Sequence, residues 1–276
     1  MSPTSHVLLD NVLLPASAAH VSATGEGFLY GHGIFETIKI LGGRPAWFAG
    51  HHARLVASAR ALDLPYAVDA GTLRERILRV ASANALVDGS AKVVLFNQDA
   101  ATTGELILTR DNPYPADAYA SGFSLRTVFT GERTGALCGH KTLNYLANIR
   151  ARRAAVAAGF DEALFLTPAG IVIEGATTNL FVVRDGVAHT PSLASGPLPG
   201  IARARILALL GPERCRETLV THSDLLRADE VFVTNALLGV MPVGRIDDRT
   251  FDLAKAPFTR ALADTYRPLE TASLVP

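Results

Sequence analysis

A short segment at residues 111–117 constrains the fold of this sequence more than any other stretch. It reads Asp-Asn-Pro-Tyr-Pro-Ala-Asp, so two prolines and three Asp or Asn residues stand close together. Proline lacks a backbone donor and restricts the residue before it, so neither a helix nor a central strand runs through such a segment. We therefore expect a linker, with a smaller amino-terminal domain at residues 1–115 and a larger carboxyl-terminal domain at residues 116–276.

Strand and helix patterns occur on both sides of this linker. Residues 34–40 alternate between apolar and polar side chains as in a strand, and Gly42-Gly43 marks a hairpin turn after them. Residues 51–62 repeat Leu and Ala at helical spacing, and residues 231–234 form a buried-strand pattern. Because the strands do not alternate regularly with helices, the pattern predicts an α+β fold with much antiparallel sheet.

The composition excludes several classes of protein. The 276 residues are 49% hydrophobic, and 26 Lys and Arg balance 26 Asp and Glu, so bulk charge attracts neither nucleic acid nor a membrane surface. No apolar run approaches the ~20 residues of a membrane span, and the first residues lack a signal-peptide pattern. Cys138 and Cys215 form neither a disulfide framework nor a metal-ligand spacing. We expect a soluble cytoplasmic protein without a metal site.

Lys141 and Glu174 are the first candidates for chemistry. Lys141 follows an irregular segment and precedes an Ala-rich helical pattern, and Glu174 ends a short apolar strand. A lysine that forms a Schiff base must be neutral when it attacks, and burial or nearby cations lower its pKa. A carboxylate beside a pyridine nitrogen keeps that nitrogen protonated, as pyridoxal phosphate chemistry requires. Taken singly, a surface lysine and a strand-end carboxylate usually have no catalytic role.

Three other features suggest an anion site. Gly200 opens a helix after two prolines, so the N–H groups of Ile201 and Ala202 point out of its positive end. An ordinary helix start is an equally good explanation of this feature alone. Thr234 ends a buried strand and could donate a hydroxyl, and Arg54 could supply a cation from the other domain.

Together these features resemble the class IV, or fold-type IV, pyridoxal-phosphate enzymes. That family includes branched-chain aminotransferases, D-amino-acid aminotransferases and aminodeoxychorismate lyases. The motifs that carry the resemblance are Gly31-His32-Gly33-Ile34-Phe35-Glu36-Thr37, His52-Ala53-Arg54-Leu55, Lys141-Thr142-Leu143-Asn144-Tyr145-Leu146, Glu174-Gly175-Ala176-Thr177-Thr178-Asn179-Leu180-Phe181, Gly200-Ile201-Ala202-Arg203 and Thr234-Asn235-Ala236-Leu237. The resemblance implies a two-domain D-amino-acid-aminotransferase-like fold, pyridoxal 5'-phosphate at the domain interface, a small-molecule amino substrate and a homodimer.

The same resemblance implies a role for each candidate residue. Lys141 forms the Schiff base with the cofactor and moves the proton during the reaction. Glu174 pairs with the ring nitrogen, and Tyr145 approaches the ring hydroxyl. The cofactor phosphate is held by Arg54, by the N–H groups of Ile201 and Ala202, and by Thr234.

Thr37 indicates which reaction the family member catalyses. The residue after Phe35-Glu36 is threonine in sequences similar to aminodeoxychorismate lyases, glycine in branched-chain aminotransferases and apolar in D-amino-acid aminotransferases. The short spacing from Lys141 to Tyr145 also resembles the lyases. With Thr37 and Lys141 as catalytic residues, we expect elimination of pyruvate from 4-amino-4-deoxychorismate to give 4-aminobenzoate for folate synthesis. The alternative is a transaminase acting on D-amino acids, (R)-amines or branched-chain amino acids with a 2-oxo acid.

One loop departs from the lyase pattern. The lyase and D-amino-acid branches often carry an arginine-rich and glycine-rich loop after the strand expected at residues 92–96. Here residues 97–104 read Asn-Gln-Asp-Ala-Ala-Thr-Thr-Gly and contain no arginine to bind a carboxylate. Arg110, Arg126 or Lys39 would then have to serve, or the substrate differs.

Overall fold

The structure is a computed structural model that describes residues 5–99, 101–132, 135 and 137–274. The expectation of no signal peptide rests partly on residues 1–4, which lie outside the described residues. The chain forms two compact units: unit 1 comprises Met1–Pro113, His140–Asn144 and Leu269–Pro276, and unit 2 comprises Tyr114–Gly139 and Tyr145–Pro268. The domain boundary after residue 115 stays a prediction. Two short segments beyond that boundary, residues 140–144 and 269–276, belong to unit 1.

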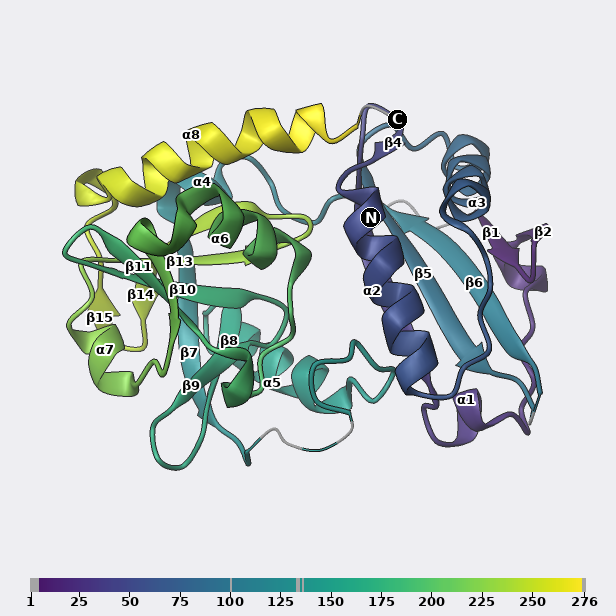
Figure 1. Ribbon diagram of the computed structural model, residues 1–276, viewed down its shortest axis with the longest axis horizontal. Coiled ribbons are helices and arrows are strands. Elements are labelled where there is room, and N and C mark those ends of the chain that lie inside the picture. Colours follow the sequence, from purple (N-terminus) through teal and green to yellow (C-terminus); the bar gives the residue numbers. More distant parts are fainter. Residues whose placement is uncertain (1–4, 100, 133–134, 136, 275–276) are drawn as a thin grey trace. The chain divides into compact units, whose positions relative to one another are not determined.

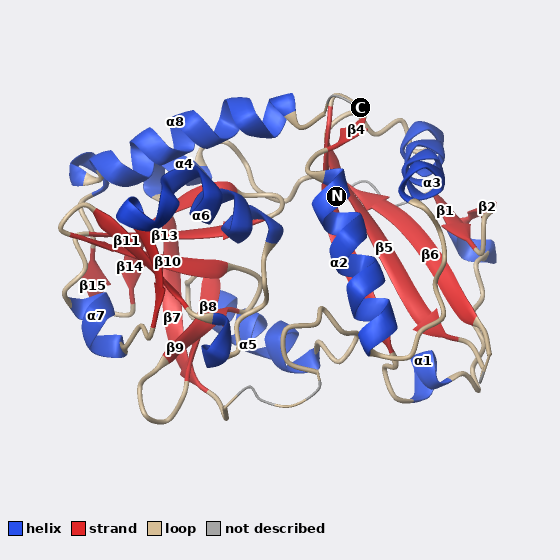
Figure 2. Cartoon of the chain, viewed as in Figure 1, coloured by secondary structure: helices blue, strands red, loops and turns tan. Residues whose placement is uncertain are grey.

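Unit 1 is built on a six-stranded sheet in the order β2-β1-β6-β5-β3-β4, and every pairing within it is antiparallel (Figures 1 and 2). Its strands are β1 (His6–Leu9), β2 (Val12–Pro15), β3 (Gly33–Leu41), β4 (Arg44–Pro45), β5 (Gly89–Asn97) and β6 (Thr103–Arg110). Its helices are η1 (Ala16–Ala18), α1 (Glu26–Leu29), α2 (Phe48–Ala61) and α3 (Ala70–Ala83).

The alternation along β3 divides its side chains between two faces. Ile34 and Ile38 are buried in one core cluster with Leu55 of α2 and Ile77 of α3, so both helices cover that face. Glu36 lies between Ile34 and Ile38 in the strand and is therefore a carboxylate on the helix-covered face. Phe35, Thr37 and Lys39 point to the opposite face of the sheet.

Unit 2 is built on a nine-stranded sheet in the order β12-β11-β10-β13-β14-β7-β8-β9, with β15 paired to β14 (Figures 1 and 2). Its strands are β7 (Phe123–Phe129), β8 (Glu162–Leu166), β9 (Val172–Gly175), β10 (Asn179–Arg184), β11 (Val187–Pro191), β12 (Cys215–Thr218), β13 (Glu230–Asn235), β14 (Gly239–Ile246) and β15 (Arg249–Thr250). Its helices are α4 (Ala118–Ser121), α5 (Leu146–Ala157), η2 (Leu193–Ser195), α6 (Ile201–Arg214), α7 (His222–Leu226), η3 (Leu253–Lys255) and most of α8 (Pro257–Ala272).

The sheet of unit 2 mixes strand directions. Only the pairs β11–β12, β7–β14 and β7–β8 are parallel among the described strands, and the other pairs are antiparallel. With the antiparallel sheet of unit 1, this confirms the α+β fold with much antiparallel sheet. Helix α8 begins in unit 2 and ends in unit 1, because the unit boundary follows Pro268.

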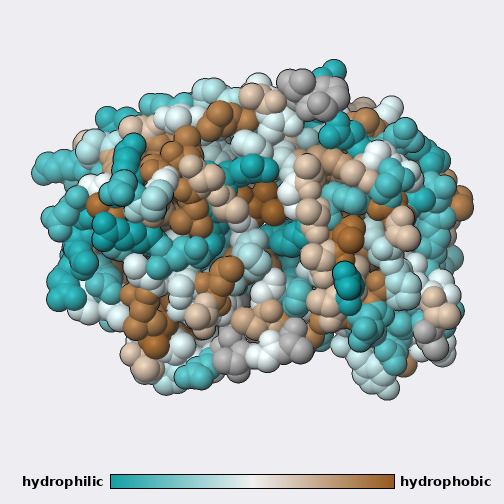
Figure 3. All heavy atoms as spheres, viewed as in Figure 1, coloured by the Kyte–Doolittle hydropathy of each residue, from teal (hydrophilic) through white to brown (hydrophobic). Residues whose placement is uncertain are grey.

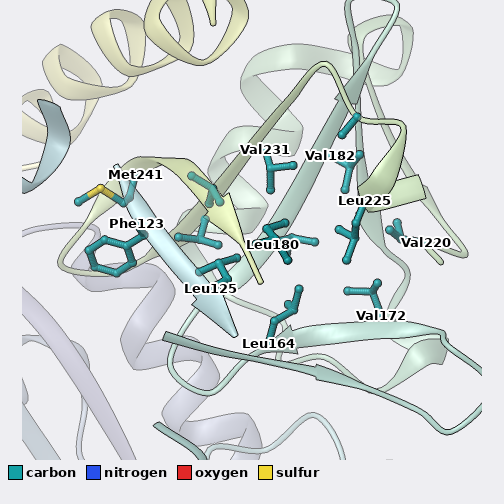
Figure 4. Close-up of a cluster of buried hydrophobic side chains, with 14 of the residues drawn as sticks. Phe123, Leu125, Leu164, Val172, Leu180, Val182, Val220, Leu225, Val231 and Met241 are labelled. Atoms are coloured by element: carbon teal, nitrogen blue, oxygen red, sulfur yellow. The ribbon is translucent and has the colours of Figure 1, made fainter. Parts of the chain in front are cut away.

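The core of unit 2 joins both halves of its sheet. Figure 4 shows side chains from β7, β8, β9, β10, β13 and β14 meeting in one apolar cluster. Leu125, Leu164 and Leu180 in this cluster are fully buried. Each such side chain contributes roughly 1.5–3 kcal/mol to the free energy of unfolding. This core therefore stabilises β9 and β13, the strands that carry Glu174 and Thr234.

In Figure 3, hydrophobic patches alternate with hydrophilic ones over the visible side. Within the part of the chain that the structure describes, no helix is long and apolar enough to cross a membrane.

Candidate active site

In unit 1, the segment that carries Lys141 is fixed by its backbone to β3. Phe35 N donates to Lys141 O at 2.8 Å, and Leu143 N donates to Gly33 O at 2.9 Å. A methyl group on Gly33 would lie 2.5 Å from Leu95 O and 2.6 Å from Leu143 Cδ1, and because the carbonyl belongs to the paired strand β5, this close approach requires glycine. The Nζ atom of Lys141 lies 4.4 Å from the centroid of the Phe35 ring. The amine of Lys141 is thus placed by two backbone hydrogen bonds and an aromatic contact.

A second lysine contacts the same ring. Lys92 stands opposite Thr37 in the pairing of β3 with β5, and its Nζ atom lies 4.1 Å from the Phe35 centroid. Burial, and to a lesser extent the charge of Arg110, lowers the pKa of Lys92 below its usual range. Lys92 is the first residue of the strand expected at residues 92–96, and no role was predicted for its side chain. A lysine within the otherwise apolar run from Ala91 to Phe96 was the signal that could have found it.

Arg54 is held by the buried carboxylate of Glu36. Its Nε and Nη2 atoms donate to the two oxygens of Glu36 at 2.7 and 2.8 Å, and the ring of His51 lies 2.8 Å from Oε2. Burial alone would raise the pKa of Glu36, but the charge of Arg54 and the hydrogen bonds from Arg54 and His51 outweigh it and lower the pKa from 4.5 to about 2. The paired geometry fixes the plane of the guanidinium group.

The three cations considered for a substrate carboxylate differ in their surroundings. Lys39 donates to Glu270 at 2.7 Å, and both side chains are largely buried. The charge of Lys39 is therefore compensated within unit 1. Arg110 ends β6 and Arg126 lies in β7 of unit 2, and both are exposed.

In unit 2, Glu174 is held by a frame around Asn179. Asn179 Nδ2 lies 3.2 Å from Glu174 Oε2 and donates to Leu198 O at 2.9 Å. The backbone N–H of Leu198 donates to the same oxygen of Glu174 at 2.9 Å. Glu174 is 7% exposed, so its carboxylate is held in one orientation. Sequence reasoning did not assign this role to Asn179.

The start of α6 adjoins the same asparagine. A methyl group on Gly200 would lie only 2.0 Å from Asn179 Oδ1, so the helix can approach because residue 200 is glycine. No side chain caps this helix start, and its first turn contains no acidic residue. The N–H groups of Ile201 and Ala202 therefore stand at the positive end of α6, and no side chain among the described residues accepts from them.

Thr234 lies across from Asn179 in the pairing of β10 with β13. It is 0% exposed, and its Oγ1 atom has no hydrogen-bond partner among the described residues. A buried hydroxyl without a partner costs about 1–3 kcal/mol. An anion bound at this position would accept the unused hydrogen.

Tyr145 is the residue just before α5, and its hydroxyl donates to Ala176 O at 2.7 Å. Ala176 belongs to the loop between Glu174 and Asn179. Unit 2 therefore gathers Glu174, Thr234 and the start of α6 around Asn179, and Tyr145 contacts the adjoining loop. Lys141, Thr37 and Arg54 belong to unit 1, where Arg54 bonds Glu36 on the helix-covered face and Thr37 lies on the opposite face of β3.

The family model described as "Amino-transferase class IV" matches residues 33–246, which is most of the chain. The chain belongs to this family. Its enzymes are transaminases and lyases that depend on pyridoxal 5'-phosphate, so the expectations of an enzyme and of this cofactor are confirmed.

Individual relatives carry three different activities. The aminodeoxychorismate lyase of Vibrio harveyi is 30% identical over 262 residues, covering 88% of this chain and 94% of that protein. The D-alanine aminotransferase of Bacillus licheniformis is 26% identical over 264 residues, covering 92% and 93%. The crystal structure of a branched-chain aminotransferase from Thermoproteus uzoniensis with norvaline is 26% identical, has a TM-score of 0.86 and covers 97% of this chain and 95% of that one. These similarities confirm the fold-type IV architecture and leave the reaction open.

The residues of this class IV chain fit the cofactor. The unpartnered Thr234 hydroxyl and the uncapped start of α6 are suited to a phosphate group. The buried carboxylate of Glu174 is suited to a protonated ring nitrogen. The individual roles of these residues stay predictions.

Proposed function

We propose that this class IV enzyme eliminates pyruvate from 4-amino-4-deoxychorismate to give 4-aminobenzoate. The observation that carries the proposal is Thr37, a half-buried hydroxyl on the face of β3 that also bears Phe35. It takes the place where an apolar residue or glycine is expected in the transaminase branches. The aminodeoxychorismate lyases among the relatives support the same reaction.

The proposed mechanism assigns one task to each side chain. When bound, pyridoxal 5'-phosphate supplies a protonated pyridine ring that withdraws electrons from the substrate. Glu174, oriented by Asn179, holds the proton on the ring nitrogen. Lys141 Nζ holds the cofactor between turnovers and then takes the proton from the substrate ring carbon. The electron pair of that C–H bond enters the ring, the bond from the ring to the enolpyruvyl oxygen breaks, and the ring becomes aromatic. Enolpyruvate leaves with the electron pair of the broken bond and takes up the proton that Lys141 Nζ removed, or one from water, to become pyruvate.

Thr37 and Lys92 are assigned to substrate recognition. The Thr37 hydroxyl can hydrogen-bond a substrate carboxylate or assist proton transfer. Residues 97–104 contain no arginine, and Lys39 is paired with Glu270, so neither provides the expected cation. Lys92 stands opposite Thr37 and is half-buried, and we assign it to the carboxylate that an arginine binds in other branches.

The alternative reaction is transamination of D-amino acids, (R)-amines or branched-chain amino acids. It is favoured by the D-alanine and branched-chain aminotransferases, which match the chain over nearly its full length. Lys141 would then take the proton from the substrate carbon that bears the amino group. Thr37 would have no special task in this reaction.

One set of assays separates the two reactions. The purified protein is incubated with 4-amino-4-deoxychorismate, and separately with D-alanine or L-leucine plus 2-oxoglutarate. Pyruvate and 4-aminobenzoate from the first, without transamination in the others, support the lyase. Transamination without 4-aminobenzoate would reject it.

A variant tests the argument from Thr37. Thr37→Val should reduce the elimination rate at least tenfold while changing cofactor affinity less. Thr265→Val, which alters an exposed threonine in α8, is the matched control. An unchanged elimination rate in Thr37→Val would remove the reason for preferring the lyase.

A homodimer and a cytoplasmic location are further proposals from the family resemblance. Sedimentation velocity of the purified protein tests the first, and a monomer at micromolar concentration would reject it.

A further inference from the structure

A buried carboxylate in unit 2 has no task in the mechanism above. Glu162 is the first residue of β8 and is 1% exposed. Burial raises its pKa, although hydrogen bonds from Thr177 and Ala163 and the charge of Arg152 act in the opposite direction. Burying a carboxylate is costly unless its oxygens are satisfied, so its partners show what it stabilises.

Both oxygens of Glu162 accept hydrogen bonds. Oε1 accepts from Ala163 N at 2.9 Å. Oε2 accepts from the backbone N–H of Thr177 at 3.1 Å and from the Thr177 hydroxyl. Thr177 lies in the loop at residues 175–178, which connects Glu174 to Asn179. Glu162 therefore holds the loop between the two residues that frame the predicted ring-nitrogen site.

The opposite side of this loop is held by α5 and the residue before it. Ala176 O accepts from the Tyr145 hydroxyl at 2.7 Å and from Asn148 Nδ2 at 2.8 Å. Ala176 N donates to Ala163 O at 2.8 Å. The hydroxyl of Tyr145, predicted to approach the cofactor ring, thus takes its position from the loop that Glu162 holds.

The loop has little room to adjust. A methyl group on Gly175 would lie 2.1 Å from Thr178 Oγ1 and 3.3 Å from Glu162 Cγ. Asn235 Nδ2, just beyond Thr234, contacts Thr177 O at 3.3 Å. Loss of the Glu162 contacts with Thr177 should therefore affect residues on both sides of the loop.

We propose that Glu162 is a positioning residue that sets the 175–178 loop and, through it, the placement of Glu174 and Tyr145 at the cofactor. This inference rests on the cofactor roles proposed above for Glu174 and Tyr145. It does not depend on whether the reaction is elimination or transamination.

The chain offers a matched control in Glu230. This carboxylate is 5% exposed and accepts from Phe258 N at 2.9 Å and from Thr259 N at 2.7 Å. It therefore also binds backbone N–H groups from a buried position, but at the start of α8. Glu230→Gln and Glu162→Gln should both lower the thermal stability of the apoprotein.

The deciding measurements are made without substrate. Equilibrium dialysis gives the dissociation constant of pyridoxal 5'-phosphate, and visible circular dichroism reports how the bound cofactor is held. Glu162→Gln should weaken binding about tenfold and reduce the dichroic band, whereas Glu230→Gln should change neither. Glu162→Gln combined with Tyr145→Phe should weaken binding by less than the product of the two single effects, because Glu162 bonds Thr177 and Tyr145 bonds Ala176 in the same loop.

Two results would overturn the proposal. One is a Glu162→Gln protein that binds the cofactor within about twofold of wild type with an unchanged dichroic band. The other is an equal effect of Glu230→Gln on both measurements. If Glu162→Gln does not fold, Thr177→Val removes only the hydroxyl donor and should weaken binding about threefold; wild-type binding by that variant would reject the proposal. Failure of the proposed function would instead appear as absence of 4-aminobenzoate formation by the wild-type enzyme.

Discussion

Lys92 lies directly opposite Thr37 where β5 pairs with β3, and its ammonium group contacts the ring of Phe35. Side chains opposite each other in an antiparallel pair stand on the same face of the sheet. Lys141 contacts the same ring from a segment more than a hundred residues away in sequence. A hydroxyl, an aromatic ring and two amines therefore come together in unit 1, although only one of the amines was singled out from the sequence.

Replacing Lys92 by methionine should test whether it binds the substrate carboxylate. Methionine keeps the apolar stem and removes the charge, so we expect KM to rise about tenfold or more with a smaller change in kcat. Lys255→Met, at a lysine whose side chain is 84% exposed, is the control. A wild-type KM in Lys92→Met would show that another cation serves.

The lowered pKa of Lys92 also predicts a pH dependence. A lysine binds an anion only while protonated, so affinity should fall as pH rises through the pKa of Lys92, below the range of an ordinary lysine. Binding of an unreactive carboxylate analogue, measured by calorimetry between neutral and alkaline pH, should show this loss. Lys92→Met should bind the analogue weakly at every pH. If the affinity of that variant falls by the same factor as the pH rises, a group other than Lys92 titrates in this range.

The Glu36 ion pair should make unit 1 sensitive to acid. The folded-state pKa of Glu36, about 2, lies below its ordinary value of 4.5. The carboxylate therefore contributes stability that is fully present above about 4.5 and is lost as pH falls towards 2, by roughly 3 kcal/mol in total. Urea midpoints across this range should fall more steeply for wild type than for Glu36→Gln, which should be less stable at neutral pH. Parallel curves for the two proteins would contradict the pairing with Arg54.

Thr234 should show opposite effects on folding and on cofactor binding. Its unpartnered hydroxyl means that Thr234→Val should leave apoprotein stability unchanged or slightly higher, while weakening cofactor binding by about 1 kcal/mol. Thr190 is the matched control, because it is also buried but donates to Leu180 O at 2.8 Å. Thr190→Val should destabilise the apoprotein and spare cofactor affinity. Loss of apoprotein stability in Thr234→Val would mean that its hydroxyl is already satisfied.

Gly200→Ala should harm both the fold and the cofactor site. The added methyl group would displace Asn179, which bonds Glu174, so we expect a loss of about 1–3 kcal/mol in the free energy of unfolding and weaker cofactor binding. Gly71→Ala in the first turn of α3 meets only the helix-capping Asp69 Oδ1 at 3.2 Å, so it should change the free energy of unfolding much less and leave cofactor binding unchanged. Chemical denaturation and dialysis on both variants provide the check.

Local patterns in the sequence predicted the elements with strong periodicity. The strand expected at residues 34–40 lies within β3, and the buried strand at residues 231–234 lies within β13. The Ala-rich helix expected after Lys141 begins only at Leu146, because Lys141 and Leu143 bond to β3 through their backbone. Helix α8 was not predicted, although Phe258, Leu262 and Tyr266 recur at helical spacing.

The motifs located the candidate residues, but their partners depend on strand pairing. The position of Lys92 beside Thr37 follows from the register of β3 with β5. That of Asn179 beside Thr234 follows from the register of β10 with β13. Glu162 holds Thr177 only because a loop folds back against β8. No local sequence pattern encodes these pairings between residues that are far apart in the sequence.

The carboxyl-terminal end of α8 has a consequence for how the protein is made. Lys39 is synthesised 231 residues before its buried partner Glu270. Domains generally begin to fold in order of synthesis. The ion pair between Lys39 and Glu270 can therefore form only after residue 270 has been synthesised. A ribosome that stops before residue 270 releases a polypeptide in which Lys39 is left without Glu270.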